Sequence, residues 1–243
     1  MQSAMTNSSQ RHSLSVAELG SERRSAARLR PSVSGPRDYL SLAIGALVLR
    51  ALFVALMHDM PQASDSLSYS DAAQDILAHF PGSKAYYWPP GTPLLLAGTY
   101  KLLGASLSVS QLFCVCVGTV NVLLTAHWAY LCLQSHRGAK LAGWLAAVYP
   151  PALLMTGQTY SQHLAVLCLL GLGISLQHAW SSGRLRHWLS LGFCLGLGIL
   201  NRPSMLVFLA VLPLAFLWLL RKKPEASAAD QPKPRLHPLG GLL

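Results

Sequence analysis

The chain has 243 residues, of which 52% are hydrophobic and 12% are charged, and its formal net charge is +10. Several apolar runs reach the roughly 20 residues that a helix needs to cross a bilayer, and such spans must satisfy their backbone hydrogen bonds internally. This composition excludes a soluble domain and predicts an all-α, polytopic bundle of transmembrane helices. The basic residues gather at the ends of the apolar runs, a pattern that orients membrane proteins and argues against nucleic-acid binding.

The sequence divides into two polar tails and a membrane domain. Residues 1–38 are rich in Ser and Arg and lack the apolar region of a secretory signal, so we expect a disordered tail. Residues 39–220 are expected to form the membrane domain, and residues 221–243 a second disordered tail. The apolar spans are expected at about 39–57, 107–133, 139–157, 161–179, 187–200 and 204–220. All five cysteines fall within spans, where we interpret them as small buried hydrophobic residues.

Charge distribution favours six crossings with both termini in the cytoplasm. The segment Thr92 to Leu103 is apolar but short, so we interpret it as an interfacial or re-entrant helix within a first outer loop, residues 58–106. Fifteen of the 19 lysines and arginines then lie inside, and only Lys84 and Lys101 lie in the outer loop. This topology places three polar segments on one outer face: residues 58–106, 158–163 and 201–203.

The first outer loop concentrates the carboxylates. It contains four of the nine acidic residues of the chain: Asp59, Asp65, Asp71 and Asp75. Asp65 and Tyr69 are four residues apart, so a short interfacial helix would place them on one face. A carboxylate there could take a proton from an acceptor hydroxyl or bind a divalent cation. The alternative is that Asp65 only caps the amino end of this helix.

Two arginines are candidates for binding a phosphate. Arg202 ends an apolar span, where its guanidinium can form bidentate hydrogen bonds to phosphate. The alternative for Arg202 is an anchor that reaches the lipid headgroups. Arg50 lies inside the first span, where a charge is costly unless it is paired or faces a polar cavity. Its candidate partners are Asp59 and Asp65.

Aromatic and histidine residues complete the polar segments. Tyr86, Tyr87 and Trp88 precede two prolines and could form a platform for a sugar ring, although aromatic residues also collect at bilayer interfaces. The histidines at positions 58, 79 and 163 have no metal-ligand spacing, so the sequence defines no metal site.

Taken in order, these features resemble the GT-C membrane glycosyltransferases that use polyprenyl-phosphate sugars. The nearest group is that of the bacterial protein mannosyltransferases and lipid A aminoarabinose transferases (glycosyltransferase family 39-like). The resemblance covers roughly residues 40–220 and rests on Arg50, on Asp65 with Tyr69 and Ala72, and on three segments. These are WPPGTPLLLAGTYKLLGAS, YPPALLMTGQTYSQHL and GLGILNRP.

The resemblance implies inverting transfer of a sugar from a lipid monophosphate carrier to a lipid, glycan or protein acceptor on the outer face of the bacterial inner membrane. Asp65 takes the place of the family's catalytic acid in the first outer loop. Arg202 and Arg50 would stabilise the departing phosphate. A divalent cation is the candidate cofactor. The residues expected to contact the acceptor or the sugar are Tyr69, Tyr87, Trp88 and Gln162.

The chain departs from the family in two respects. Gln162 stands where the family often carries an acid, and family members usually continue with further spans. We therefore expect a truncated product, an amino-terminal half completed by a second polypeptide, or an inactive remnant. The rival functions are a non-catalytic protein that binds lipid phosphate or a partner, and a small transporter. Transport is disfavoured because no pair of interrupted spans repeats across two halves.

Overall fold

The computed structural model describes residues 36–57, 62, 64–83 and 88–221. Within these ranges the regular elements are all helical, which confirms the predicted all-α fold. The helices are α2 (Pro36–Leu56), α3 (Ser64–Ala78), α4 (Gly91–Leu103), α5 (Leu107–Leu133), α6 (His136–Val148), α7 (Pro150–Thr156), α8 (Ser161–Ser182), α9 (Leu185–Asn201), the 3₁₀ helix η1 (Pro203–Leu206) and α10 (Val207–Arg221).

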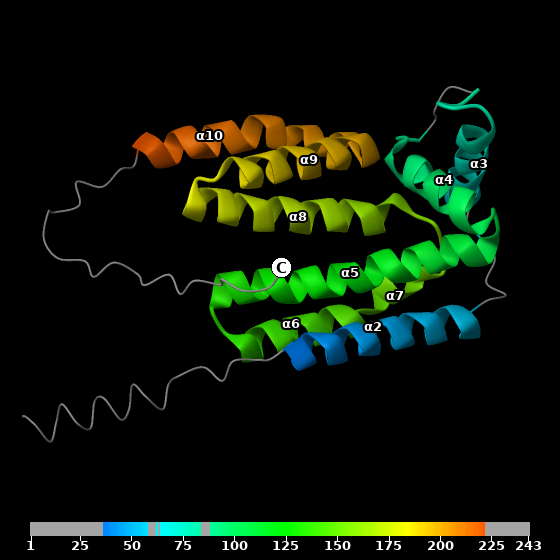
Figure 1. Cartoon of the computed structure of the whole chain (residues 1–243), viewed down its shortest axis with the longest axis horizontal. Coiled ribbons are helices and arrows are strands. Elements are labelled where there is room, and N and C mark those ends of the chain that lie inside the picture. Colours follow the sequence, from blue (N-terminus) through cyan, green and yellow to red (C-terminus); the bar gives the residue numbers. More distant parts are fainter. Residues whose placement is uncertain (1–35, 58–61, 63, 84–87, 222–243) are drawn as a thin grey trace, which may run out of the picture. The chain divides into compact units, whose positions relative to one another are not determined.

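Helix α5 is the centre of the bundle formed by residues up to Pro203. It packs against α2 and α6 on one side and against α8 on the other, and α9 packs along α8 (Figure 1). Leu42 and Ala46 of α2 form a core with Val122 and Ala126 of α5 and with a buried alanine of α6. Small residues allow such close packing between membrane helices.

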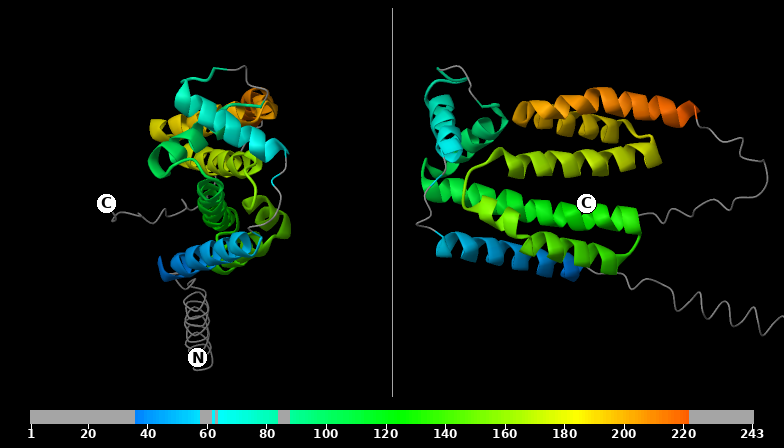
Figure 2. Two further views of the ribbon diagram at one scale, coloured as in Figure 1. Left: turned by 90° about the vertical axis from the view of Figure 1, so that its right-hand side faces the viewer. Right: turned by 180° about the vertical axis from the view of Figure 1, so that it is seen from behind.

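The first outer loop folds into two helices that lie across one end of the bundle (Figures 1 and 2). Helices α3 and α4 share a buried apolar cluster: Ala73, Ile76, Leu96, Ala97 and Tyr100. The Tyr100 hydroxyl is 2.8 Å from Ser70 Oγ of α3 and also hydrogen-bonds Ser110 Oγ of α5. The two loop helices are therefore fastened to each other and to the start of α5.

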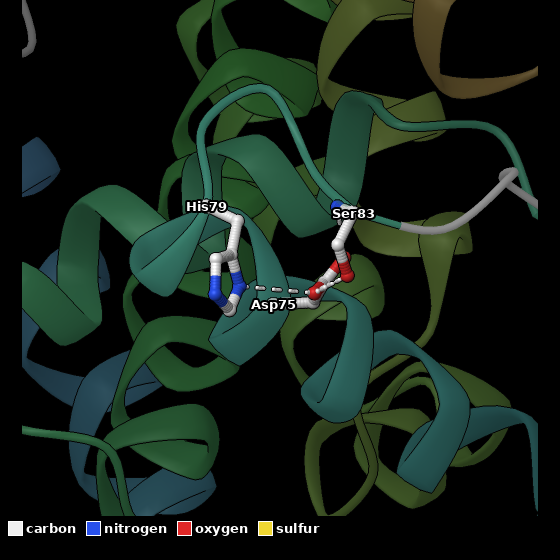
Figure 3. A network of polar contacts seen from close by, with 3 residues as sticks. All are labelled: Asp75, His79 and Ser83. Atoms are coloured by element: carbon white, nitrogen blue, oxygen red, sulfur yellow. Dashed lines mark hydrogen bonds and ion pairs between the residues drawn. The ribbon is translucent and has the colours of Figure 1, made fainter.

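The carboxylate of Asp75 holds the chain that follows α3. It accepts hydrogen bonds from the Ser83 backbone N–H, at 2.8 Å, and from the Ser83 hydroxyl (Figure 3). His79 Nδ1 lies 3.6 Å from the same carboxylate. These contacts assign Asp75 a structural role in closing the loop after the helix.

Three of the described helices are long and apolar enough to cross a bilayer: Tyr39–Leu56, Leu107–Leu133 and Ser161–Ser182. The predicted span 139–157 is divided into α6 and α7 at Tyr149, because the prolines at positions 150 and 151 lack the backbone N–H that a continuous helix requires. Helix α9 has 17 residues, at the lower end of the roughly 17–25 that a span needs. The six-crossing topology stays a prediction.

Residues from Ser204 onward belong to a second compact unit. Its described helix, α10, is strongly apolar and carries Pro213 in its interior. It corresponds to the predicted last span, although it is shorter than a typical crossing.

The three polar segments that the sequence placed on one face do meet at one end of the bundle. The carboxyl ends of α2 and α9 and the amino ends of α5 and α8 lie at the end that carries α3 and α4 (Figure 1). The connection between α5 and α6 lies at the other end. Which end faces the cytoplasm is a prediction from the charge distribution.

Labelling of single cysteines tests that orientation. Lys101 of α4 and Arg137 of α6 are both exposed and lie at opposite ends of the 27-residue helix α5. In a chain whose native cysteines are replaced by alanine, a membrane-impermeant maleimide added outside intact cells should modify Lys101→Cys and spare Arg137→Cys. Permeabilised cells should label both, and modification of Arg137→Cys from outside would reverse the orientation.

Candidate functional site

The buried side chain of Asn201 joins three helix ends. Asn201, the last residue of α9, accepts a hydrogen bond from Thr92 Oγ1 at the start of α4 and donates one of 2.8 Å to the Ser161 carbonyl at the start of α8. A Cβ atom on Gly91 would lie 2.7 Å from the Asn201 backbone, so glycine is needed at this approach. The start of α4, the start of α8 and the end of α9 are therefore held together by one side chain.

The turn between α7 and α8, residues 157–160, receives the start of α3. Ser66 Oγ accepts a hydrogen bond of 2.8 Å from the Thr159 backbone N–H. Gln62 Nε2 donates to the Gly157 carbonyl at 3.2 Å, and Gln111 of α5 donates to the same carbonyl at 3.5 Å. The second outer turn thus fixes the position of the first outer loop.

Asp65 lies in the first turn of α3, beside Ser66, and its side chain is half-buried. Helix α3 begins at Ser64, which places Asp65 inside the helix rather than at the residue that precedes it. No hydrogen bond or ion pair joins the Asp65 carboxylate to another residue that the structure describes, so this carboxylate is free to accept a proton.

Two of the aromatic residues expected near Asp65, Tyr69 and Trp88, pack against each other. The ring centroids of Tyr69 and Trp88 are 6.0 Å apart with planes inclined by 35°, a contact favourable for aromatic rings. Tyr69 lies one turn after Asp65 and is only 4% exposed, so its buried ring supports Trp88. Tyr87 lies outside the described residues.

Arg202 lies at the same end of the bundle as Asp65. Its side chain is exposed, and its backbone N–H donates to the Gly198 carbonyl, which caps α9. The neighbouring Asn201 contacts Ser161, while the neighbour of Asp65, Ser66, contacts Thr159. Because Thr159 and Ser161 are two residues apart, their Cα atoms lie within about 7 Å of each other, and the residues next to Asp65 and Arg202 in sequence contact one short turn.

Arg50 lies inside α2, as expected, and is held by backbone carbonyls. It is 1% exposed, and Nη1 donates to the carbonyls of Ala46, at 3.3 Å, and Ala147, at 3.5 Å. No ion pair with Asp65 is formed, because Arg50 lies six residues before the end of α2, about 9 Å further into the bundle. The other expected partner, Asp59, lies outside the described residues.

Beside Arg50 is a cavity of about 460 Å³ between α2, α5, α7 and α8. Arg50, Asn121, Gln162 and His163 line it, and each has a buried polar atom without a hydrogen-bond partner. The atoms are Arg50 Nε, Asn121 Oδ1, Gln162 Oε1 and His163 Nε2. An unsatisfied buried polar group costs about 1–3 kcal/mol, so four around one cavity indicate that the cavity serves a purpose other than stability.

The predicted site residues therefore fall into two groups. Asp65, Tyr69, Trp88 and Arg202 lie at the end of the bundle, whereas Arg50 and Gln162 line the cavity. Asn121 was not predicted to be a functional residue, and His163 was considered only as a possible metal ligand. The available signal was a polar side chain inside an apolar span, the same signal that singled out Arg50.

Within the described residues, no three side chains of His, Cys, Asp or Glu lie close enough to hold a metal ion. A divalent cation at Asp65 would thus depend on one protein carboxylate together with donor phosphate or water oxygens. The need for a cation stays a prediction.

Replacing Gly118 tests how tightly Arg50 is held. A Cβ atom on Gly118 of α5 would lie 2.8 Å from Arg50 Nε, so Gly118→Ala must displace a guanidinium that is held by two carbonyls. We expect thermal unfolding of the purified chain to show a loss of about 1–3 kcal/mol, typical of overpacking. Gly98→Ala is the control, because nothing lies within 4 Å of its added Cβ. Equal stability of both variants would contradict the packing of Arg50 on α5.

Comparison with known proteins identifies a family. The family model described as dolichyl-phosphate-mannose-protein mannosyltransferase matches residues 88–242, more than half of the chain. The matched region includes Trp88, Gln162 and Arg202, whereas Arg50 and Asp65 precede it. No curated protein and no solved structure matched the chain. The chain therefore belongs to the dolichyl-phosphate-mannose-protein mannosyltransferase family, whose members are membrane glycosyltransferases of the GT-C type.

Proposed function

We propose that this chain transfers a sugar from a polyprenyl-phosphate donor to a hydroxyl group of an acceptor at the end of the bundle that carries α3 and α4. The observation that carries the proposal is the placement of Asp65 and Arg202 around residues 159–161, through the contacts of Ser66 and Asn201. A carboxylate and a guanidinium on either side of one short turn supply a base for the acceptor and a cation for the leaving phosphate.

The proposed reaction is a single displacement at the anomeric carbon. The acceptor oxygen forms a bond to that carbon while the bond from the carbon to the phosphate oxygen breaks, which inverts the configuration. The acceptor proton passes to the Asp65 carboxylate, and the lipid leaves as a polyprenyl monophosphate. Negative charge grows on the phosphate as the bond breaks, so a fixed cation there lowers the barrier.

Local structure suits each residue to its part. Asp65 lies in the first turn of α3 and its side chain is half-buried, so its carboxylate can meet an acceptor hydroxyl, as a general base must. Arg202 is exposed and directly follows the fully buried Asn201. Its backbone is therefore held in place, while its guanidinium can reach a lipid phosphate. Its planar fork matches two phosphate oxygens. The packed rings of Tyr69 and Trp88 would contact the sugar ring.

The donor explains why this chemistry belongs at a membrane surface. A polyprenyl chain stays in the bilayer, and only its phosphate and sugar emerge at the ends of the helices. We place this end outside the cytoplasm, in a bacterial inner membrane with both termini of the chain inside, because Arg137, Lys140, Arg184 and Arg186 lie near the helix connections at the opposite end (Figure 1). The acceptor is a lipid, a glycan or a protein with a free hydroxyl.

Substitution of Asp65 tests the base. Asp65→Asn keeps the shape and removes the proton acceptor, so we expect the loss of about 10²–10⁴ in rate that is usual for a general base. The rate is measured as the release of radiolabelled sugar from a polyprenyl-phosphate donor in membranes that contain the full chain. Asp71→Asn, on an exposed position of the same helix, is the control and should stay near the parent rate. An equal loss in both variants would remove the special role of Asp65.

Substitution of Arg202 tests the phosphate contact. Arg202→Ala removes the charge, and Arg202→Lys keeps the charge but loses the fork, so both should weaken donor binding. Hydrogen bonds to charged groups contribute about 1.5–3 kcal/mol, so we expect roughly 10- to 150-fold weaker binding of a polyprenyl-phosphate sugar by Arg202→Ala. Lys101→Ala, which removes another exposed cation, is the control. Unchanged donor affinity in both Arg202 variants would leave Arg202 as an interfacial anchor.

A further inference from the structure

The cavity beside Arg50 has the buried, unpaired polar groups of a binding site. Three of its polar residues are more than nine-tenths buried: Arg50 at 1% exposed, His163 at 6% and Asn121 at 8%. Five buried side-chain polar atoms in the described part of the chain lack a hydrogen-bond partner, and four of them belong to residues of this cavity. Such groups are otherwise almost always paired in proteins, so their concentration at one cavity points to a partner that binds there.

Among the described residues, the charge of the cavity favours an anionic ligand. Arg50 carries a positive charge inside a transmembrane helix, and no Asp or Glu is among the residues that line the described cavity. Two backbone carbonyls accept hydrogen bonds from Nη1 but bring no negative charge. Because an uncompensated charge in the membrane is costly, a bound anion would stabilise this arrangement.

The remaining polar atoms require a ligand that donates hydrogen bonds. The Asn121 amide nitrogen already donates to the His163 carbonyl at 2.9 Å, which leaves Oδ1 as an acceptor. His163 Nε2 is also buried without a partner, and in the neutral imidazole with its proton on Nδ1 this nitrogen is an acceptor. Gln162 Oε1 is the third acceptor. An anion with hydroxyl groups would satisfy the guanidinium and these three acceptors together.

Apart from Thr125 and Tyr149, the other side chains that line the cavity are apolar. Val122, Pro151, Met155 and Val166 line it, and its helices α2, α5 and α8 are the three that are long and apolar enough to span a bilayer. A ligand in this position therefore arrives from the lipid and carries an apolar chain. A small water-soluble anion would bring nothing to contact these walls.

We propose that the cavity binds an anionic phospholipid whose phosphodiester headgroup carries hydroxyl groups, as phosphatidylglycerol does. The phosphate contacts Arg50, the headgroup hydroxyls donate to Asn121, Gln162 and His163, and an acyl chain lies along the apolar wall. The occupant is a lipid of the surrounding bilayer and not the reacting sugar donor. A sugar held here would have no carboxylate to activate its acceptor, since none lines the cavity.

Lipid binding by the purified full chain tests this proposal without any measurement of sugar transfer. The probes are phosphatidylglycerol, phosphatidylmethanol, which has the same charged phosphodiester without headgroup hydroxyls, and zwitterionic phosphatidylcholine. We expect native mass spectrometry to retain phosphatidylglycerol at least tenfold more than phosphatidylcholine, with phosphatidylmethanol between them. Equal retention of phosphatidylglycerol and phosphatidylcholine would overturn the proposal.

Two variants assign the lipid to the cavity. Arg50→Gln should abolish the preference for both anionic lipids over phosphatidylcholine. Gln162→Met keeps the size of the side chain and should reduce only the preference for phosphatidylglycerol over phosphatidylmethanol. This second variant retains Arg50, so it gives a result even if Arg50→Gln does not fold. Lys101→Gln, which removes an exposed cation, should leave all preferences unchanged.

Three outcomes would contradict the site. Retention of phosphatidylglycerol by folded Arg50→Gln at the parent level would place the lipid elsewhere. An unchanged preference for phosphatidylglycerol over phosphatidylmethanol in Gln162→Met would remove the role of the headgroup hydroxyls. Displacement of phosphatidylglycerol by an equimolar polyprenyl-phosphate sugar would make the donor the occupant. The proposed transfer reaction at Asp65 could fail in its own assay while the lipid result stands.

Discussion

The hydrogen bonds of Asn201 are the constraint on which the candidate site depends. Apolar side chains gain little by leaving lipid for the interior of a membrane protein, so helix ends in a bilayer are located by close packing and by hydrogen bonds between helices. Asn201 provides both, because it is fully buried, contacts α4 and α8, and packs against Gly91. With these ends joined, Arg202 is held next to the turn that also receives the start of α3.

The polar groups of the bundle lie at two depths, and the two depths suit different tasks. At the end of the bundle, Asp65 and Arg202 can meet water, an acceptor and a lipid phosphate. About 9 Å further in, Arg50 is enclosed by helices and depends on carbonyls and on whatever fills the neighbouring cavity. We propose that the residues at the end of the bundle serve the transfer reaction and that the cavity beside Arg50 holds a lipid of the bilayer.

The sequence was sufficient for the features that depend on local pattern. Continuous apolar runs predicted α2, α5 and α8, and the four-residue spacing of Asp65 and Tyr69 predicted the helix that carries them. It was insufficient for contacts between helices. The rotation of α5 and α8 about their axes brings Asn121 and His163 to one cavity, and no single-helix pattern contains that rotation. Of the two candidate partners of Arg50, Asp65 is not paired with it, because sequence proximity ignores the length of helix between Arg50 and the end of α2. The other candidate, Asp59, lies outside the described residues.

Cysteine cross-linking between positions 92 and 201 tests the central claim most directly. In a chain whose five native cysteines are replaced by alanine, Thr92→Cys and Asn201→Cys place two thiols where the Thr92 hydroxyl and the Asn201 amide oxygen are 2.5 Å apart. We expect mild oxidation in membranes to form this disulfide efficiently, whereas Thr99→Cys with Asn201→Cys, about two turns further along α4, should stay reduced. Failure of the first pair to cross-link, or equal cross-linking of both pairs, would contradict the account of how the site is assembled.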